Sequence, residues 1–516
     1  MPRPPPDHLL VPMMPTPNGP LHLGHAAGPY LRMDVLARHL RQSGGRVALV
    51  TSTDSFESHV LQSATRHGET PAQTCQFYRD AIARDFAFLR IDFDAFVEPS
   101  ASAASSGYRL AHAHLVDTLH ANGAARFRSE ACLVDADTGA AVPGFLLSGH
   151  CPACGAATVG HVCEQCGLQM TADMLHAPRA LDGRRLRWAE AMTLALDGAA
   201  DPSLPVRIDA MNLPSEFRAA IRAFVTDPRN LVRLSVTGGY GVGPHHVGGR
   251  DICLYNSYFG HALYWAQWWQ ARHGGLPPFS RDSPVVTVTS CGLDNATDLG
   301  ASLLCAAGSG RRSFDHCLVN FFLTLDGAKF STGANHAIFV GDVAARGAVA
   351  ADGLRYRLAT LSPERSTRDF RVDDFVACYN DDFIDRLAGC GDAVLQRATA
   401  VPANDVAHTR WDDAMRARAH ALAPDQFSLP AYAAIVRDYA AHAPDGGAGA
   451  ASWLRGLSVL AWPLLPTLCE RWWRALGFPE TPCVPIAWSD RPAVAIESVR
   501  HGVAPITAAD VPRTRP

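Results

Sequence analysis

Two histidines near the amino-terminal end of the chain have the residue type and spacing to bind an anion. The segment "PNGPLHLGH" (residues 17–25) places His22 and His25 three residues apart. The sequence predicts a strand before this segment and a helix after it, so both imidazoles would lie at a helix N-terminus, which attracts negative charge. Donors held there can stabilise the charge that spreads over phosphate oxygens during attack at phosphorus. The alternative is an ordinary surface or core pair of histidines.

A single lysine, Lys329, lies in the segment "LDGAKFSTGANH" (residues 325–336), whereas the other 45 of the 46 basic residues (46 minus this lysine) are arginine. The chain is also rich in alanine, glycine and proline, a bias typical of a GC-rich genome. A lysine kept under that bias indicates a position that needs a compact ammonium on a flexible stem rather than a planar guanidinium fork. The alternative is a solvated charge left by chance on a surface loop.

Four of the 14 cysteines cluster in the segment "CPACGAATVGHVCEQC". They form two C-x-x-C pairs, Cys151 with Cys154 and Cys163 with Cys166, separated by eight residues. Two tight turns that each offer two thiolates suit one tetrahedral zinc ion, and four protein ligands leave no open position for chemistry. The pattern therefore predicts one structural zinc ion. Two disulfides or four idle thiols are the alternative, which fits a chain from a reducing compartment poorly.

The bulk composition is that of an ordinary globular protein. With 516 residues, 47% of them hydrophobic, the chain can bury a large core and is expected to divide into three or four domains. The formal charge of −4 gives no overall attraction for nucleic acid, although "GRRLRW" (residues 183–188) could form a local basic face. The sequence shows no signal peptide and no run of 18 apolar residues, so we expect a cytoplasmic protein without a membrane segment.

The elements that would position these residues alternate between strands and helices. Residues 9–14 are predicted to form a buried strand, residues 26–44 an amphipathic helix, and residues 46–54 a second strand. This order is a βαβ unit, the building block of parallel sheets that bind ligands at the carboxyl ends of their strands. Strand character resumes at residues 283–294 and again ends in a glycine turn.

The two motifs together resemble the signatures of a known enzyme family. The string P-x-P-N-G-x-x-H-L-G-H after a first strand, with a Lys-x-Ser loop about three hundred residues later, resembles the motifs of class I aminoacyl-tRNA synthetases, and among them the methionyl-tRNA synthetases most closely. The resemblance implies an α/β fold: a Rossmann-like class I synthetase catalytic domain with an inserted zinc-knuckle connective domain and a C-terminal α-helical bundle. A zinc knuckle in this position is also a property of the methionyl enzymes.

The resemblance also implies a domain plan. The two halves of the Rossmann catalytic domain are expected at residues 1–114 and 236–325, with the connective insertion at 115–235 carrying the zinc knuckle at 151–166 among irregular loops. The Lys-x-Ser loop and linker would occupy residues 326–370, an anticodon-binding-like helical bundle residues 371–480, and an extended tail that packs back on the body residues 481–516.

In that family, ATP with Mg²⁺ lies between the paired histidines and a mobile lysine loop, which closes on the leaving pyrophosphate while an amino-acid carboxylate attacks the α-phosphorus. The resemblance therefore implies that His22, His25, Lys329 and Ser331 are catalytic. The second loop lysine of the family is replaced by Thr332 and its following serine by Gly333, a departure that predicts slow or altered activation.

Matched positions also imply the substrate sites. Asn18, Gly24, Gly292 and Asp294 are expected to contact ATP, with Asp294 toward the ribose hydroxyls. Asp54, after the second strand, matches the aspartate that binds the α-ammonium of the amino acid. The alternatives are a helix-capping aspartate at position 54 and an ordinary turn aspartate at position 294.

The side-chain pocket departs from the methionine enzymes. The implied pocket residues are Met14, Thr16, Leu254, Tyr258, His261 and Leu299. Leu254 stands at the matched position of a family tryptophan, Tyr258 of a proline, His261 of a tyrosine, Leu299 of a histidine, Thr16 of a tyrosine and Met13 of a small residue. Because pocket volume and polarity decide selectivity, these changes predict another, smaller amino acid such as glycine or alanine. Sequence drift with a shifted alignment is the alternative.

The helical region departs as well. Methionyl enzymes read the anticodon with an asparagine, an arginine and a tryptophan, whose matched positions hold Gly389, Ala393 and Asp445. Losing these groups removes the means to recognise an unstacked RNA loop.

The resemblance therefore favours an ATP-dependent ligase that forms an aminoacyl adenylate and passes it to an acceptor other than tRNA. The methionyl-synthetase-like hydrazine synthetases of natural-product pathways, which esterify an amino acid onto a hydroxylamine before a cupin forms the N–N bond, are a precedent. The cupin would here be a separate chain. The alternatives are a genuine methionine–tRNA ligase and a catalytically weak module that binds an amino acid or nucleotide.

Overall fold

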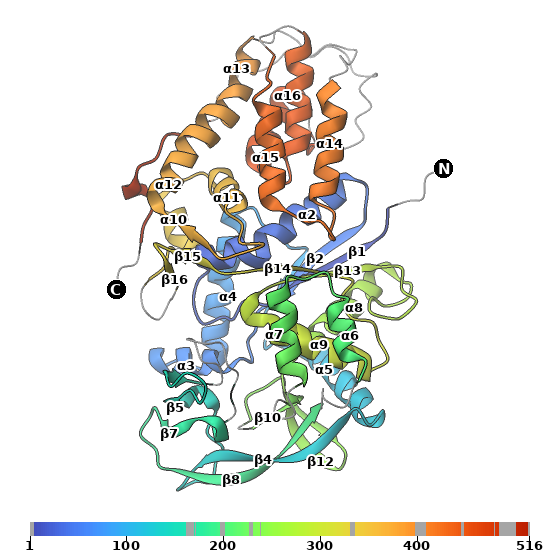
Figure 1. Ribbon diagram of the computed structural model, residues 1–516, viewed down its shortest axis with the longest axis vertical. Coiled ribbons are helices and arrows are strands. Elements are labelled where there is room, and N and C mark those ends of the chain that lie inside the picture. Colours follow the sequence, from blue (N-terminus) through green and yellow to red (C-terminus); the bar gives the residue numbers. More distant parts are fainter. Residues whose placement is uncertain are drawn as a thin grey trace.

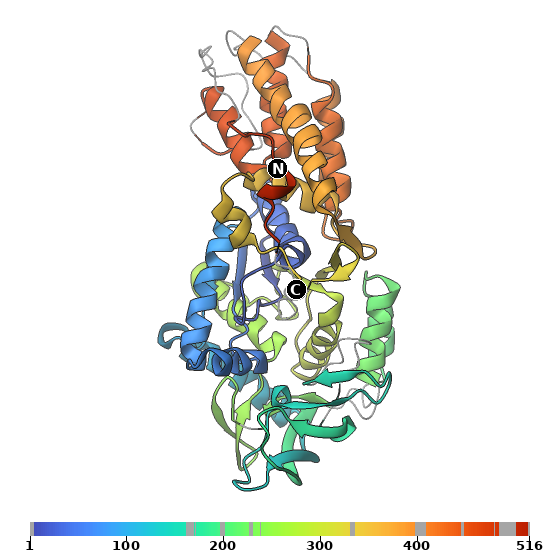
Figure 2. The ribbon, with the colours of Figure 1, turned by 90° about the vertical axis from the view of Figure 1, so that its left-hand side faces the viewer.

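A parallel sheet lies in the middle of the molecule, with a strand-rich insertion at one end and a bundle of helices at the other (Figure 1; Figure 2). The computed structural model describes residues 5–160, 170, 172–196, 202–226, 231–237, 239–330, 336–397, 409–444, 448–478, 480–483 and 502–513. Among these residues, no helix is both long enough and apolar enough to cross a membrane.

The central sheet has five parallel strands in the order β14-β13-β1-β2-β3. The chain starts in the middle strand, moves outward to β2 and β3, and returns on the other side of β1 as β13 and β14. The direction switches beside the carboxyl end of β1, where sheets of this kind bind ligands. The predicted α/β fold with a parallel sheet is confirmed. The strands are β1 His8–Pro12, β2 Val47–Ser52, β3 Ala95–Val97, β13 Val286–Gly292 and β14 His316–Asn320.

Helices cover both faces of this sheet because successive residues of a strand point to opposite sides. Leu10 of β1 packs with Leu49, Val288 and the side chains of α2 on one face. Leu9 and Val11 belong to the apolar cluster on the other face, which is formed with α5, α8 and α9. The covering helices are α2 Leu31–Gln42, α5 Ser102–Ala121, α8 Tyr258–His273 and α9 Ala296–Gly308.

The helical stretch after β1 is bent. It consists of α1 Leu23–His25 and η1 Ala26–Tyr30, followed directly by α2. The bend lies at Gly28, whose ψ of −114° is not helical, directly before Pro29, which lacks an N–H donor. A Cβ at position 28 would lie 3.2 Å from Asn320 Nδ2 at the end of β14, so the glycine permits this close approach. Two further helices, α3 Ser58–His67 and α4 Pro71–Phe88, follow β2.

The insertion contains regular strands where the sequence predicted irregular loops. Two three-stranded antiparallel sheets have the orders β4-β8-β9 and β6-β5-β7, and a third, β10-β12-β11, follows them. The expectation was wrong because the long strand β4 exposes residues on both faces, so its sequence lacks the apolar alternation that marks a half-buried strand. The strands are β4 Ala125–Asp135, β5 Leu147–His150, β6 Ala157–Val159, β7 His176–Ala180, β8 Leu186–Leu196, β9 Val232–Arg233, β10 Ser235–Val236, β11 Pro244–Val247 and β12 Arg250–Leu254. The helices of this region are η2 Gly144–Leu146, η3 Ala172–Met174, α6 Leu204–Asp209 and α7 Ser215–Thr226.

A small sheet with the order β16-β15-β17 carries the lysine and connects the parallel sheet to the bundle (Figure 1). The turn between β15 and β16 is the dipeptide Asp326-Gly327, with φ values of 51° and 83°. Asp-Gly is favoured in such two-residue hairpin turns because both central residues need positive φ. The strands are β15 Leu323–Leu325, β16 Ala328–Lys329 and β17 Arg368–Phe370, and the helices between them are α10 Val340–Arg346 and α11 Ala351–Thr360.

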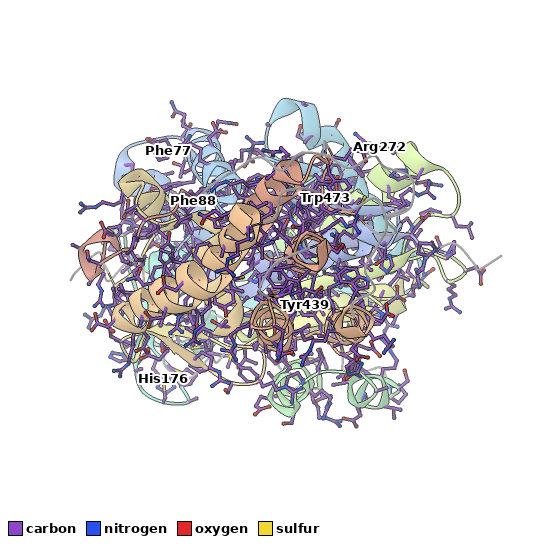
Figure 3. The ribbon with its side chains drawn as sticks, turned by 90° about the horizontal axis from the view of Figure 1, so that it is seen from above. Phe77, Phe88, His176, Arg272, Tyr439 and Trp473 are labelled. Atoms are coloured by element: carbon purple, nitrogen blue, oxygen red, sulfur yellow. The ribbon has the colours of Figure 1, made fainter. Side chains whose placement is uncertain are left out.

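The bundle buries large aromatic side chains between its helices. Tyr439 stacks on Trp453 with ring centroids 5.9 Å apart, and both are almost fully buried. Seen from above, Tyr439 and Trp473 lie among the helices of the bundle (Figure 3). The helices are α12 Val372–Ala377, η6 Cys378–Ala388, α13 Gly389–Arg397, α14 Thr409–Ala421, α15 Leu429–Ala440, α16 Ala448–Ala461 and α17 Pro466–Ala475.

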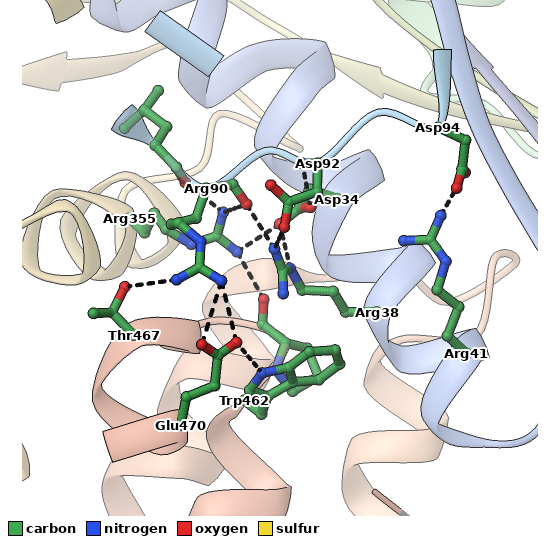
Figure 4. Close-up of polar contacts among 12 residues, drawn as sticks. Asp34, Arg38, Arg41, Arg90, Asp92, Asp94, Arg355, Trp462, Thr467 and Glu470 are labelled. Atoms are coloured by element: carbon green, nitrogen blue, oxygen red, sulfur yellow. Dashed lines mark hydrogen bonds and ion pairs between the residues drawn. The ribbon is translucent and has the colours of Figure 1, made fainter. Parts of the chain in front are cut away.

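A buried ion-pair network joins the catalytic domain to the bundle (Figure 4). Asp34 of α2 accepts hydrogen bonds from Arg38 at 2.9 Å and from Arg355 of α11 at 2.8 Å, and all three side chains are almost completely buried. Arg355 also donates to the carbonyl oxygens of Pro463 and Leu464, which precede α17. Burial opposes ionisation of Asp34, but the two guanidinium groups outweigh this and lower its pKa.

Residues 502–513 pack back on the body of the molecule. Ile506 and Val511 are buried, and Asn380 of η6 exchanges two 2.9 Å hydrogen bonds with the backbone of Ile506. Arg513 donates to Asp326 at 2.6 Å, in the hairpin turn that precedes Lys329. The segment contains one short helix, η7 Ala508–Asp510.

Candidate active site

The paired histidines cap the helix that follows β1. The Nδ1 atom of His22 accepts the backbone N–H of His25 at 3.3 Å, and the Nδ1 atom of His25 accepts the backbone N–H of His22 at 3.4 Å. The two rings stack with centroids 3.7 Å apart. Because both Nδ1 atoms are acceptors, a neutral ring of each histidine carries its hydrogen on Nε2. The local fold thus fixes the tautomers and leaves two N–H donors for an anion.

Both histidines are held neutral. Burial and the neighbouring imidazole lower the pKa of His22 well below its usual value, and Lys329 lowers it further. The protein atoms packed around the ring lower the pKa of His25 to about 4 by desolvation, although the residue is exposed at the surface. At neutral pH the pair therefore offers hydrogen-bond donors rather than positive charge.

The turn that carries the histidines is fixed from two sides. The backbone of Leu21 and Leu23 pairs with Val340 and Ile338, the segment that follows the lysine hairpin, through hydrogen bonds of 2.9 and 3.0 Å. From α4, the buried carboxylate of Asp85 accepts the N–H of Leu21 at 2.9 Å. Burial raises the pKa of Asp85 to about 6. The position of His22 is thus coupled to the segment next to the lysine.

Lys329 lies within electrostatic reach of the histidines. Its ammonium is exposed and sits 4.9 Å from the ring centroid of Phe322. Its charge lowers the pKa of His22 and also acts on Asp294. Phe330, the next residue, stacks on His22 with centroids 5.1 Å apart. The fold thus brings the lysine and the histidines, far apart in sequence, to one place. Ser331, Thr332 and Gly333 lie outside the described residues.

Two glycines permit the close packing expected of a nucleotide site. A Cβ on Gly24 would lie 3.0 Å from the His22 ring, and a Cβ on Gly292 would lie 2.4 Å from an Asp294 carboxylate oxygen. Burial raises the pKa of Asp294, and Lys329 opposes this shift. Asn18, in the loop between β1 and the histidines, is partly buried. Gly292 ends β13 next to β1, so these residues line the switch point of the sheet.

Asp54 lies at the next strand end and has an amide partner. It follows β2 closely, and its carboxylate accepts the Asn256 Nδ2–H at 2.6 Å. The Asn256 carbonyl in turn accepts the Tyr108 hydroxyl at 2.8 Å. Burial and the nearby Glu57 raise the pKa of Asp54 well above its usual value, and no cation in the described part of the chain is among the groups that offset this shift. Such a carboxylate is well suited to bind an ammonium group.

The predicted side-chain pocket residues largely come together. Met13, Met14, Leu254, Tyr258 and Leu299 are all buried in the apolar cluster on the same face of the sheet. The Tyr258 hydroxyl donates to the Val11 carbonyl at 2.6 Å and lies 2.5 Å from the Thr289 hydroxyl, so this ring is fixed across β1 and β13. Thr16 is only partly buried, beyond the end of β1.

His261 reaches the same region from α8. Its side chain is fully buried, and its Nδ1 atom lies 2.9 Å from the hydroxyl of Ser52, at the end of β2. The His261 ring lies 5.8 Å from the Tyr258 ring and 6.1 Å from the Tyr108 ring. Burial lowers the pKa of His261 well below its usual value, so the imidazole is neutral.

Only half of the predicted metal site lies in the part of the chain that the structure describes. Cys151 and Cys154 flank a tight turn in which the Gly155 N–H donates to the Cys151 carbonyl at 2.9 Å and Gly155 has a φ of 72°. This turn is compatible with two thiolates on one ion. Cys163 and Cys166 lie outside the described residues, and the described residues include no group of three or more side chains that could hold a metal.

The positions matched to anticodon-reading residues lie on the bundle. Gly389 begins α13 and Ala393 lies one turn further, both partly buried. Asp445 lies outside the described residues.

Several residues that position the predicted site carry no sequence signal. Asn256, Tyr108, Ser52 and Asp85 contact site residues that are 64 to 209 positions away in the chain. The end of a predicted strand, two residues before Asp54, is the only sequence pattern that could have pointed to Ser52. The other three sit in ordinary helices or loops.

A parallel sheet with two histidines at its switch point and a lysine hairpin facing them defines a class I synthetase catalytic domain. The chain belongs to the family described as tRNA synthetases class I (M), whose sequence model matches residues 8–196 and 301–395. It is therefore a ligase of the class I aminoacyl-tRNA synthetase family, whose members form aminoacyl adenylates from ATP.

Curated relatives are distant. The methionine–tRNA ligase of Beutenbergia cavernae is 27% identical over 432 residues, which cover 75% of this chain and 68% of the relative. That of Roseiflexus sp. is 28% identical over 411 residues, covering 73% and 67%. The methionyl-tRNA synthetase of Mycobacterium tuberculosis bound by methionyl-adenylate has the same fold, with a TM-score of 0.69, 17% identity, and coverage of 96% of this chain and 99% of that chain.

Proposed function

We propose that this ligase activates a small amino acid other than methionine and transfers it to a small-molecule acceptor rather than to tRNA. The proposal rests on a contrast within one site, between the groups suited to adenylate formation and the residues expected to line the side-chain pocket. The groups suited to adenylate formation, His22, His25 and Lys329, lie together. Tyr258, which is fixed by two hydrogen bonds, would fill space in the side-chain pocket that we propose beside them.

The proposed reaction begins with the amino acid held by its α-ammonium on Asp54. Its carboxylate attacks the α-phosphorus of ATP, and pyrophosphate leaves; Mg²⁺ supplied with the ATP would offset phosphate charge. The Nε2–H groups of His22 and His25 stabilise the charge that develops on the phosphate oxygens, because they are preorganised and need no proton transfer. The mobile ammonium of Lys329 follows the leaving pyrophosphate. Asn18, Gly24, Gly292 and Asp294 would hold the nucleotide.

In the second step, the hydroxyl oxygen of an N-hydroxylated amine attacks the acyl carbon of the adenylate. An ester forms, the bond between the acyl carbon and the phosphate oxygen breaks, and AMP leaves with the proton passing to solvent. A cupin, as a separate chain, would then form the N–N bond: the amine of the esterified amino acid attacks the hydroxylamine nitrogen, the N–O bond breaks, and the carboxylate is released. The replaced base-reading positions, Gly389, Ala393 and Asp445, support an acceptor other than tRNA.

We also propose one structural zinc ion on Cys151, Cys154, Cys163 and Cys166. The turn at Cys151 to Gly155 supports this assignment, since it fits a C-x-x-C zinc knuckle.

A genuine methionine–tRNA ligase is the second candidate function. It is favoured by the family match and by the methionine–tRNA ligases among the relatives. A third candidate, a weak amino-acid or nucleotide sensor, is favoured by Thr332 and Gly333 in the lysine loop.

ATP–pyrophosphate exchange across the twenty amino acids tests these candidates, followed by acceptor trials with tRNA and with N-hydroxylated amines. We expect exchange with a small amino acid, ester formation with the hydroxylamine, and no charged tRNA. Asp54→Asn should raise the KM for the amino acid at least about tenfold, since it removes the charge that pairs with the ammonium. Methionine-dependent exchange with methionylated tRNA would establish the second candidate, and no exchange at all would favour the sensor.

A further inference from the structure

Two buried polar atoms on one face of α8 lack partners in the part of the chain that the structure describes. They are the Nε2 atom of His261 and the Nε1–H donor of Trp265, one helical turn later. Both side chains are fully buried, and their rings meet edge to face with centroids 6.2 Å apart. Buried polar atoms are rarely left unpaired, so an adjacent ligand is a natural partner for them.

The contact behind His261 allows its Nε2 atom to be an acceptor. The Nδ1 atom of His261 lies 2.9 Å from the Ser52 hydroxyl, and either group can be the donor. In the tautomer whose Nδ1–H donates to Ser52, the neutral ring has a bare acceptor at Nε2. In the other tautomer Nε2–H is a donor, from which a hydroxyl oxygen can accept.

An acceptor and a donor side by side fit a hydroxyl group. A hydroxyl can donate to His261 Nε2 and accept from Trp265 Nε1–H, whereas a methyl group or a hydrogen atom can do neither. A thioether has no donor and an ammonium has no acceptor. Tyr258, fixed over the same region, favours a short side chain.

We propose that the activated amino acid carries a short hydroxyl side chain, with serine as the first choice, and that His261 and Trp265 recognise this hydroxyl. This inference rests on the proposed function, since it names the substrate of the same adenylation site. It names serine in place of the glycine or alanine that the sequence predicted as the activated amino acid.

The ammonium and hydroxyl sites are two ends of one contact chain. Asp54 lies two residues after Ser52 on the same strand end, and the Tyr108 ring lies between Asn256 and His261. A substrate whose ammonium is on Asp54 can therefore extend its side chain toward His261.

The test is ATP–pyrophosphate exchange by the full chain with serine, threonine, alanine, glycine and methionine. We expect kcat/KM for serine to exceed that for alanine at least about 100-fold, because a site built to bond a hydroxyl strongly rejects the analogue that lacks it. His261→Phe removes the acceptor and should lower the serine-to-alanine ratio of kcat/KM at least about tenfold.

Further variants separate recognition from packing. His261→Gln keeps an acceptor and should retain more of the serine-to-alanine ratio than His261→Phe. Ser52→Ala removes the hydrogen-bond partner of His261 Nδ1, so the ring is no longer held in one tautomer, and this variant should lower the ratio. His273→Phe, at the exposed end of the same helix, is the matched control and should leave the ratio unchanged. If His261→Phe does not fold, the Gln and Ala variants carry the test.

Equal exchange with serine and alanine, or a ratio that His261→Phe leaves intact, would overturn the hydroxyl inference while leaving the proposed function standing. A preference for methionine would overturn both. Absence of exchange with every amino acid would overturn the proposed function itself.

Discussion

At the scale of single residues, the histidine pair shows how backbone geometry determines chemistry. Each ring uses Nδ1 to accept the other residue's backbone N–H, so both Nε2–H groups are left for a ligand. The lowered pKa values of His22 and His25 keep the pair neutral at physiological pH. Under the proposed function, an anion would meet two fixed dipoles here, and the full positive charge would come from the flexible side chain of Lys329.

Lys329→Arg tests whether that mobility matters. The charge is kept but the compact ammonium becomes a planar fork, so we expect the rate of adenylate formation to fall at least about tenfold. ATP–pyrophosphate exchange at saturating substrate measures this rate. Arg185→Lys, an exchange in the opposite direction on the exposed surface of the insertion, serves as control and should change nothing. An unchanged rate in Lys329→Arg would show that the only lysine of the chain has no special role.

At the scale of elements, α4 holds the histidine turn through one carboxylate. Asp85 accepts the Leu21 N–H although burial raises its pKa to about 6. The charges nearest to it, Arg84 and Asp342, act in opposite directions. A folded-state pKa above the unfolded value means that the folded protein retains a proton that the unfolded chain loses between about pH 4 and pH 6. The stability contributed by this proton is therefore lost as the pH rises through that window.

Asp85→Asn keeps a carbonyl acceptor for Leu21 and removes the buried charge. We expect the variant to be more stable than the parent by about 1–3 kcal/mol at pH 7, and the difference to shrink toward zero near pH 4. Urea unfolding at several pH values measures it. Asp85→Leu, which removes the acceptor as well, should instead lose about 1–3 kcal/mol. A gain that does not vary with pH would contradict the raised pKa.

The cysteine turn is the second element with a testable role. If the zinc proposal is correct, the purified protein contains about one zinc ion per chain, and Cys154→Ser, which removes one of four ligands, lowers this content and the Tm. Mass spectrometry of metal content and thermal unfolding with and without a chelator measure both. Cys132→Ser is the matched control, because this half-buried cysteine lies outside the cluster on β4. Zinc-free protein that unfolds at the same temperature in chelator would refute the metal site.

At the scale of the whole molecule, the bundle is anchored to the catalytic domain by charge. Asp34 and Arg355 are fully buried and come from elements more than 300 residues apart. Losing one partner leaves an uncompensated charge in a medium that solvates it poorly. The same pair at the surface would contribute little. The network therefore acts mainly by making separation of the two domains costly.

Asp34→Ala should destabilise the protein by about 3–5 kcal/mol, because Arg355 and Arg38 lose their shared partner. The double variant Asp34→Leu/Arg355→Met should recover part of this loss, since it removes both charges. Arg41→Ala is the matched control on the same helix: its 2.6 Å pair with Asp94 is partly exposed, and its loss should cost less than about 1 kcal/mol. Calorimetry measures all three. A loss in Asp34→Ala no larger than that of Arg41→Ala would show that the pair does not anchor the bundle.

The sequence by itself determined the parallel α/β fold and the histidine turn; it also placed the lysine in a loop, which the structure shows to begin with a hairpin. Each of these depends on residues close together in the chain: an apolar period, a glycine turn, or the Asp326-Gly327 dipeptide. Sequence patterns failed to predict the strands of the insertion. The strand β4 exposes residues on both faces, so its sequence lacks the apolar alternation of a half-buried strand.

Only the tertiary structure decided which distant groups meet. Asn256 bonds Asp54 across 202 positions, His261 bonds Ser52 across 209, and Asp85 holds Leu21 across 64. Partners so far apart leave no periodic or local pattern in the chain, because their proximity arises from how strands and helices pack. The hydroxyl side chain that we propose for the substrate is inferred from such long-range contacts around His261.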